Sequence, residues 1–439
     1  MVELRNDEHA ILSRYIVSVW QQKGGSMSKN KTVVISDVHL SNGSNNYSWF
    51  KDDTKLKGFL NEIAERADIK ELVLLGDIFD LWLYPIDEIP WTAEQIIQHW
   101  SGSNSVVSAL KKCADKLPDV YYINGNHDMG VTAADLALIS PKMKFRTADQ
   151  YNADHANKVQ FEHGNLVDIF NAPDISGNSI NGLPFGYFIT RLVATAQNHD
   201  TLWDEIADIV RSYLRRIFGL NNSLRQQKSL EFGISLIDDW IERKLEKYGK
   251  LLLESIIDVL LDYVRIYHPS IDENSPILLP DGSSVAIGRV KEHYHKLLPN
   301  WYQKLRSLSD LYRSALASEN LAWYAKKLLQ DGPEKTVVMG HTHEGKILMR
   351  HEGQYANSGC WISDRQATYV EIDPADSPQA VVKAYPGNTR IVSAMAFAGH
   401  ENMMRSSSKS LTDSSDPLTD EAAWEEEPLP QLWRQKPTE

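Results

Sequence analysis

The predicted β-strands in the first half of this chain each run directly into a polar cluster. These strands cover residues 32–36, 72–75, 120–123 and 159–161. Helices are predicted between them, at 56–66 and 106–116, and such alternation is typical of an α/β fold with a mostly parallel sheet. Ligands bind these sheets beyond the carboxyl ends of the strands, where the polar clusters lie.

The polar clusters contain the residue types that hold divalent metal ions. They are Asp37-Val38-His39, Gly76-Asp77 with Asp80, Gly125-Asn126-His127-Asp128, His163-Gly164 and Gly340-His341-Thr342-His343. Carboxylates, imidazoles and amides are ligands of hard and borderline cations, and two adjacent cations can promote attack on phosphorus. Each cluster alone is also compatible with an ordinary turn, and His155 competes with His163 for its role. Together they predict a site for two ions.

Charge and cysteine content narrow the class of protein. The formal net charge of −13 disfavours broad capture of nucleic acid, but a small phosphorylated substrate can still bind because cations dominate the local field. Cys113 and Cys360 form no disulfide framework, which fits a reducing compartment. No uncharged apolar run reaches the roughly 18 residues of a membrane span, and a secretory signal pattern is not found. We expect a cytoplasmic protein and leave its oligomeric state open.

Changes of pattern divide the chain into five predicted parts. They are a helical extension (1–29), a core in two pieces (30–189 and 331–394), a mainly helical cap insertion (190–330) and an acidic, mostly disordered tail (395–439). Within the cap, helices are predicted at 202–217, 252–263, 301–316 and 319–329, with a hairpin at 277–287. The second piece of the core contains predicted strands at 336–339, 354–357, 368–372 and 381–385.

The order of the clusters, Asp-x-His, Gly-Asp-x-x-Asp, Gly-Asn-His-Asp, His-Gly and Gly-His-x-His, resembles the calcineurin-like metallophosphoesterase superfamily. The resemblance covers about residues 31–175 and 333–390. It implies an α/β fold in which a sandwich of two sheets is flanked by helices, here with a large helical cap. It also implies an enzyme that hydrolyses phosphate esters.

The same resemblance implies a role for each site residue. One metal would be held by Asp37, His39, Asp77 and His343, and the other by Asp77, Asn126, His163 and His341. His127 would face the phosphoryl group, with its imidazole oriented by Asp80. We expect two Mn²⁺ ions, with Fe, Zn, Ni or Mg as alternatives, and attack by a hydroxide that bridges them.

Two motifs are similar to the branch of the superfamily that contains UDP-2,3-diacylglucosamine pyrophosphatases, which act in lipid A synthesis. They are Gly76-Asp-Ile-Phe-Asp-Leu-Trp82 and Asn357-Ser-Gly-Cys-Trp361. The chain departs from that branch at His127, where its best-known members carry arginine, and in its longer insertion. The resemblance therefore implies the metal chemistry and leaves the substrate open, including contact with a lipid-linked one.

Three residues after the His163 motif are candidates for substrate binding: Arg191, Asn171 and Asp168. An arginine there could hold a second phosphate with two parallel hydrogen bonds, and a surface salt bridge is the alternative. We expect hydrolysis of a phosphodiester or pyrophosphate in a small, nucleotide-linked substrate. A protein or small-molecule phosphomonoesterase, a nuclease and a metal-fold interaction protein remain alternatives.

Overall fold

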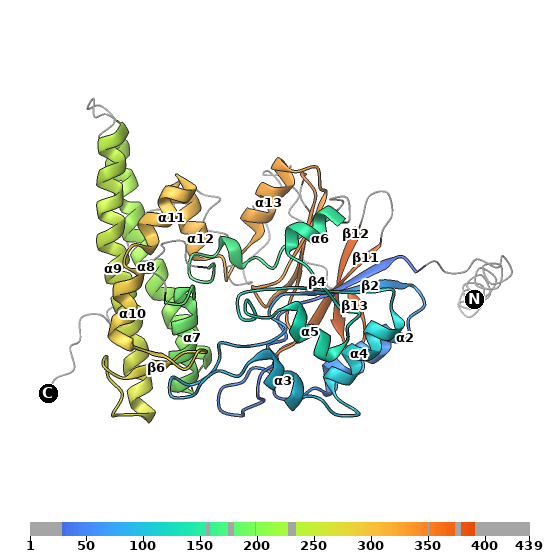
Figure 1. The fold of residues 1–439 in the computed structure, drawn as a ribbon. Coiled ribbons are helices and arrows are strands. Elements are labelled where there is room, and N and C mark those ends of the chain that lie inside the picture. Colours follow the sequence, from blue (N-terminus) through green and yellow to red (C-terminus); the bar gives the residue numbers. More distant parts are fainter. Residues whose placement is uncertain are drawn as a thin grey trace, which may run out of the picture.

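The core of the protein consists of two facing β-sheets, and a helical cap lies beside it (Figure 1). The computed structural model describes residues 29–154, 159–173, 180–197, 199–226, 234–349, 351–373 and 379–390. The predicted N-terminal helix and acidic tail fall on residues outside this set. None of the described helices is both long enough and apolar enough to cross a bilayer.

The larger sheet has seven strands in the order β13-β12-β11-β1-β2-β3-β4. Their bounds are β1 (Lys31–Ile35), β2 (Ile69–Leu75), β3 (Asp119–Ile123), β4 (Lys144–Phe145), β11 (Ala367–Asp373), β12 (Gln379–Tyr385) and β13 (Thr389–Arg390). Strands β1 to β4 pair in parallel, as the alternation with helices predicts, and β11 to β13 extend the sheet in antiparallel fashion. The carboxyl ends of β1, β2 and β3 therefore meet at one edge.

The smaller sheet has four strands in the order β5-β8-β10-β9. They are β5 (Gln160–Phe161), β8 (Thr336–Met339), β9 (Gly345–Met349) and β10 (Gln354–Ser358). Val338 and Ala356 of this sheet join Val34 and Val73 of the larger sheet in one buried cluster, so the two sheets pack face to face. This packing confirms the expected sandwich. The short edge strand β9 is not among the predicted strands.

Helices cover the outer faces of both sheets. On the larger sheet lie α2 (Thr54–Glu65), α3 (Ala93–His99), α4 (Val106–Lys116) and α5 (Ala133–Ile139). The predicted bounds of α4 are confirmed, and Ser105 caps its first turn by accepting from Ser108 N. On the smaller sheet, α13 (Ala322–Asp331) packs through Ala325 and Leu329, and α6 (Ala148–Asp154) precedes β5.

The cap helices pack in one hydrophobic cluster around Leu214, Ile256 and Trp301, which extends to Trp82 and Phe170 of the core loops. The cap comprises α7 (Phe185–Ala196), α8 (His199–Gln226), α9 (Ile234–Tyr267), β6 (Pro276–Leu278), β7 (Ser284–Ala286), α10 (Ile287–Tyr294), α11 (Leu297–Leu305) and α12 (Leu308–Ala315). Helices α8 and α9 lie side by side as a long hairpin (Figure 1). The predicted strand pair at 277–287 is confirmed by β6 and β7.

The single helix predicted at 301–316 is wrong, because the chain breaks between α11 and α12. Arg306 adopts a left-handed conformation with φ of 52°, and Ser307 then caps α12 by accepting from Asp310 N. The packing also suggests different bounds for the cap. Helix α7 starts within the predicted core piece but packs with the cap, whereas α13 lies in the predicted cap but packs on the smaller sheet. The domain division therefore stays a prediction.

Candidate metal centre

Loops that follow strands of both sheets bring acidic and histidine side chains together at one edge of the sandwich. Three groups have ligand atoms within 4.8 Å of one another: Asp37, His39 and His343; His39, Asp77 and His127; Asp77, His163 and His341. Asp77 and His39 each belong to two groups, so the three groups form one connected cluster. All seven residues come from the predicted clusters, and six of the seven are predicted metal ligands.

The backbone at the predicted ligands is held in an unusual conformation. Among the described residues, nine non-glycine residues have φ in the left-handed region, and five of them are Asp37, His39, Asp77, His341 and His343. Side chains other than glycine rarely adopt this region, and such strain tends to gather at functional sites. The loops therefore aim these side chains at a common centre at a cost in local backbone energy.

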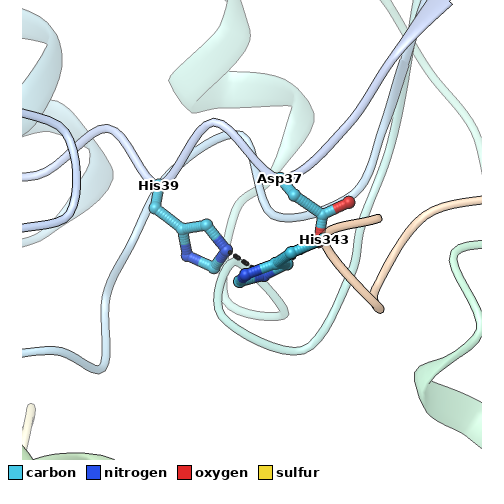
Figure 2. A group of neighbouring side chains, drawn as sticks. All are labelled: Asp37, His39 and His343. Atoms are coloured by element: carbon cyan, nitrogen blue, oxygen red, sulfur yellow. Dashed lines mark hydrogen bonds and ion pairs between the residues drawn. The ribbon is translucent and has the colours of Figure 1, made fainter. Parts of the chain in front are cut away.

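Figure 2 shows how the first group comes together from two distant segments of the chain. Nε2 of His39 lies 3.0 Å from Nε2 of His343, and the same atom of His343 lies 3.4 Å from Asp37 Oδ1. Two nitrogen ligands bound at about 2.1 Å and at right angles around one cation lie about 3 Å apart. The spacing of the two imidazoles therefore fits a shared metal ion.

His163 gives a sharper test of whether a cation fits. Its Nδ1 lies 2.9 Å from the carbonyl oxygen of Leu75, which can only accept, so Nδ1 carries the proton. Nε2 lies 3.1 Å from Asp77 Oδ2, yet it is buried and has no hydrogen-bond partner among the described residues. If the ring is neutral, the lone pair on Nε2 faces a lone pair on Asp77 Oδ2. A cation between the two atoms would satisfy both.

The charges of the cluster also favour bound cations. Burial opposes the ionisation of Asp77, but His163 and His127 hold its pKa well below the ordinary value. Burial likewise disfavours the His163 imidazolium, but the carboxylates of Asp77 and Asp37 outweigh it and raise the pKa of His163 to about 10. The pocket thus stabilises positive charge, which a divalent ion would supply in place of the proton.

Asp80 lies between two imidazoles and gives them different environments. Its Oδ2 lies 3.1 Å from His39 Nδ1, and its Oδ1 lies 2.9 Å from His127 Nδ1. Burial lowers the pKa of His39, whereas Asp80 and Asp77 overcome burial at His127 and raise its pKa. A neutral His39 suits a metal ligand, and a protonated His127 suits an acid that faces substrate.

The close approach of the loops requires a residue without a side chain at position 125. A Cβ atom on Gly125 would collide with Asp77 Oδ1 and would lie 2.7 Å from His163 Cδ2. The Gly-Asn-His motif therefore serves the site through its glycine as well as through its polar residues, because the glycine lets two predicted ligands pass beside the backbone.

Three residues that were not predicted to have a role support the site. Asp128 accepts from Gly125 N at 2.6 Å and from Ile78 N at 2.8 Å, so it ties together the loops that carry Asp77 and Asn126. Asn357 donates to Gly340 O at 2.6 Å and braces the His341 loop. Both lie inside the quoted motifs, which could have indicated them.

The third supporting residue is Trp49, which lies in a loop outside the motifs quoted above. Its ring lies 4.6 Å from that of His39 and 5.4 Å from that of His343, centroid to centroid. Trp203 of α8 lies 6.4 Å from Trp49. An aromatic contact between the core and the cap therefore lies directly beside the candidate metal centre.

The structure argues against the predicted phosphate-binding role of Arg191. Its guanidinium is fully buried, and its five N–H groups donate to the Tyr187 hydroxyl and to four carbonyl oxygens. These carbonyls belong to Tyr84, Pro85, Glu88 and Leu278. With no donor left for a phosphate, Arg191 instead joins α7 to the 84–88 loop and β6. The alternative of a surface salt bridge is wrong as well.

Asp168 and Asn171, the other two predicted substrate-binding residues, follow the short 3-10 helix η1 (Asn165–Val167). Asp168 is 1% exposed, and its carboxylate lies 3.0 Å from His341 Nε2. Asn171 lies within hydrogen-bond distance of both Asp168 and Asn126. Both residues thus face predicted metal ligands, and their protein contacts leave little capacity for a substrate.

Comparison with known proteins agrees with this geometry. The family model for calcineurin-like phosphoesterases matches residues 31–362, which include every predicted ligand and the whole cap. The comparison with individual curated proteins finds no match. Because the match covers most of the sequence and the two-sheet fold carries a buried histidine and aspartate cluster, the chain belongs to the calcineurin-like phosphoesterase family.

Proposed function

We propose that this protein hydrolyses a phosphodiester or pyrophosphate bond in a small, nucleotide-linked substrate and uses two divalent metal ions. The observation that carries the proposal is that Asp77 lies in one group with His39 and in another with His163 and His341, since a shared carboxylate is what two neighbouring cations need. The four side chains around one ion would be those of Asp37, His39, Asp77 and His343. Those around the other would be Asp77, Asn126, His163 and His341.

Two bound cations would lower the pKa of bound water and neutralise charge on the phosphate oxygens. The remaining work falls to protein side chains. His127, held through Nδ1 by Asp80, is in position to hold a proton for the leaving oxygen. Trp82 stacks on the same imidazole with centroids 4.6 Å apart, which restricts the ring further. The orientation of His127 is therefore fixed from two sides before substrate binds.

The cap supports a small substrate over a large one. Trp203 of α8 contacts Trp49 beside the metal centre, and Ser314 of α12 hydrogen-bonds to the loop that carries Asp168. A protein phosphatase or a nuclease needs an open groove for an extended polymer, which this contact of cap and core disfavours. The net charge of −13 also disfavours nucleic acid.

Within the family, we infer that the chain is nearest to the branch of UDP-2,3-diacylglucosamine pyrophosphatases. The motifs at 76–82 and 357–361 and the helical cap support this. Mn²⁺ remains our expected ion, because imidazole, carboxylate and amide ligands suit it. A cytoplasmic location remains a prediction from the two cysteines, which are both buried and free.

The test is hydrolysis of bis-p-nitrophenyl phosphate and p-nitrophenyl phosphate by full-length protein. The protein is first stripped with a chelator and then supplied with Mn²⁺. We expect activity only after Mn²⁺ is added, with a preference for the diester, and we expect Asp77→Asn to abolish it. A preference for the monoester would move the assignment to a phosphomonoesterase. No activity in protein that binds two ions would favour a pyrophosphate substrate or an interaction protein.

A further inference from the structure

The loop after β5 contains the buried carboxylate of Asp168, which contacts two neighbouring residues and one predicted metal ligand. Oδ1 of Asp168 accepts from Phe170 N at 2.9 Å, and Oδ2 accepts from Asn171 Nδ2 at 3.0 Å. Oδ2 also lies 3.0 Å from His341 Nε2. Because an ionised carboxylate only accepts, Nε2 of His341 must carry the proton. The lone pair of that imidazole is then on Nδ1, the nitrogen that remains for a metal.

The side-chain amide of Asn171 connects Asp168 to a second predicted metal ligand, Asn126. Asn126 donates from Nδ2 to Asn171 Oδ1 at 3.4 Å, which directs its own Oδ1 the other way. That oxygen is buried and has no hydrogen-bond partner among the described residues. A buried amide oxygen without a donor is costly, and a divalent cation is a partner that it prefers.

These contacts form one chain, Asn126–Asn171–Asp168–His341, which joins loops far apart in the sequence. We propose that Asp168 and Asn171 are positioning residues for the ion held by Asn126, His163 and His341, which rests on the metal site proposed above. They present the donor atoms of two ligands and do not bind substrate. Hydrogen bonds behind metal ligands usually fix ring tautomer and orientation in this way.

The cap fixes the loop in which this chain of contacts is built. Ile169 N donates to Ser314 O at 3.1 Å, and the Ser314 hydroxyl donates to Val167 O at 2.5 Å. On the other side, Gly186 N donates to Phe170 O at 2.8 Å, and a Cβ atom on Gly186 would collide with Asn171 Oδ1. Helices α7 and α12 therefore hold Asp168 and Asn171 against the core, which connects cap placement to one of the two ions.

The test measures metal binding and not turnover. Wild type, Asp168→Asn and Asn171→Leu are stripped with a chelator and titrated with Mn²⁺ by calorimetry, and electron paramagnetic resonance then detects spin-coupled Mn²⁺ pairs. In Asp168→Asn one carboxylate oxygen becomes a donor, so at least one of its three contacts is lost. We expect one ion to bind as in wild type and the other about 10–100-fold more weakly. Asn171→Leu should act in the same direction with a smaller effect.

The matched control is Asp208→Asn, the same substitution at an exposed aspartate of α8 that pairs with Arg211. It should bind both ions as wild type does and show the coupled signal. The proposal is overturned if both folded variants retain two ions with wild-type affinity, or if both ions weaken equally. Circular dichroism checks folding, and if Asp168→Asn does not fold, Asn171→Leu decides alone. Wild-type protein that binds no Mn²⁺ would instead refute the metal site itself.

Discussion

At the scale of single residues, Asp80 lies between His39, a predicted metal ligand, and His127, the predicted catalytic acid. Both imidazoles touch the same carboxylate, but only His39 also lies within 3.0 Å of another predicted ligand nitrogen, that of His343. His127 nevertheless forms a group with His39 and Asp77 that could itself hold an ion. Its role as an acid and its role as a ligand therefore make different predictions.

Replacing His127 by alanine distinguishes these roles. If it donates a proton to the leaving oxygen, His127→Ala should lower turnover of bis-p-nitrophenyl phosphate by roughly 10²–10⁴-fold and leave two Mn²⁺ ions bound. Turnover and metal content are measured on the same preparation. His99→Ala, which removes an exposed histidine of α3, is the control and should change neither. Loss of an ion from His127→Ala would show that this residue is a ligand.

Much of the site was predictable residue by residue, because each ligand sits in a short motif at a strand end. The predicted contact of Asp80 with His127 also occurs, at 2.9 Å. What spacing could not show is which side-chain contacts Arg191, Asp168 and Asn171 would make. Those depend on how the 84–88 loop, the cap and the core pack together, and no local pattern encodes that packing.

At the scale of elements, a cluster of charges joins β1, β11, β12 and the residue that ends α2. Glu371 of β11 lies 2.7 Å from Arg66 Nη1, 3.0 Å from Lys383 Nζ and 3.2 Å from Lys31 Nζ. Burial alone would raise the pKa of this carboxyl, but hydrogen bonds from Arg66 and Lys383 outweigh burial and lower it to about 2. The charged form is therefore the one that the fold stabilises.

This cluster predicts a stability difference that depends on pH. Because the folded pKa of Glu371 lies below the unfolded value, its contribution is complete above about pH 4.5 and is lost as the pH falls toward 2. Glu371→Gln should cost roughly 2 kcal/mol at pH 7, and the difference from wild type should narrow below pH 4.5. Thermal unfolding of both proteins from pH 7 to pH 3 measures it.

The control for that series is Glu65→Gln, which removes an exposed carboxylate of α2 that pairs with Lys112 and Lys116. Exposed ion pairs contribute little, so its unfolding curve should follow wild type at every pH. A constant difference between Glu371→Gln and wild type across the whole range would show that the cost arises from packing and not from charge.

The elements themselves were predictable where the pattern was strong. The strands β1, β2, β3, β8 and β10 to β12 lie at the positions predicted for them. The break between α11 and α12 was missed because the apolar spacing continues through it. Ser307, with Asp310 three residues later, is the capping signal that could have revealed it. Strand β9 was missed since it is a short edge strand, which carries little pattern.

At the scale of the whole molecule, the candidate metal centre joins parts that are otherwise held mainly by apolar packing. Asp37, His39 and Asp77 follow strands of the larger sheet, and His163, His341 and His343 follow strands of the smaller one. Ions bound between them would link the two sheets at one edge of the sandwich. The meeting of the loops after β1, β2 and β3 was predictable from the parallel order of those strands. Which loops of the smaller sheet would join them was indicated by the family resemblance, because sequence spacing does not show it.

The same arrangement predicts that metal ions stabilise the whole fold. A ligand that binds only the folded state at 100 times its dissociation constant adds about 2.7 kcal/mol, on the order of 5 °C in midpoint. Chelator-treated protein should therefore unfold at a lower temperature, and Mn²⁺ should restore the midpoint in a concentration-dependent way. Scanning calorimetry measures both changes.

Asp77→Asn should respond far less, because it lacks the shared carboxylate. Equal responses of Asp77→Asn and wild type to Mn²⁺ would place the stabilising ion elsewhere, and hydrogen exchange should then show protection away from the loops after β1 and β8.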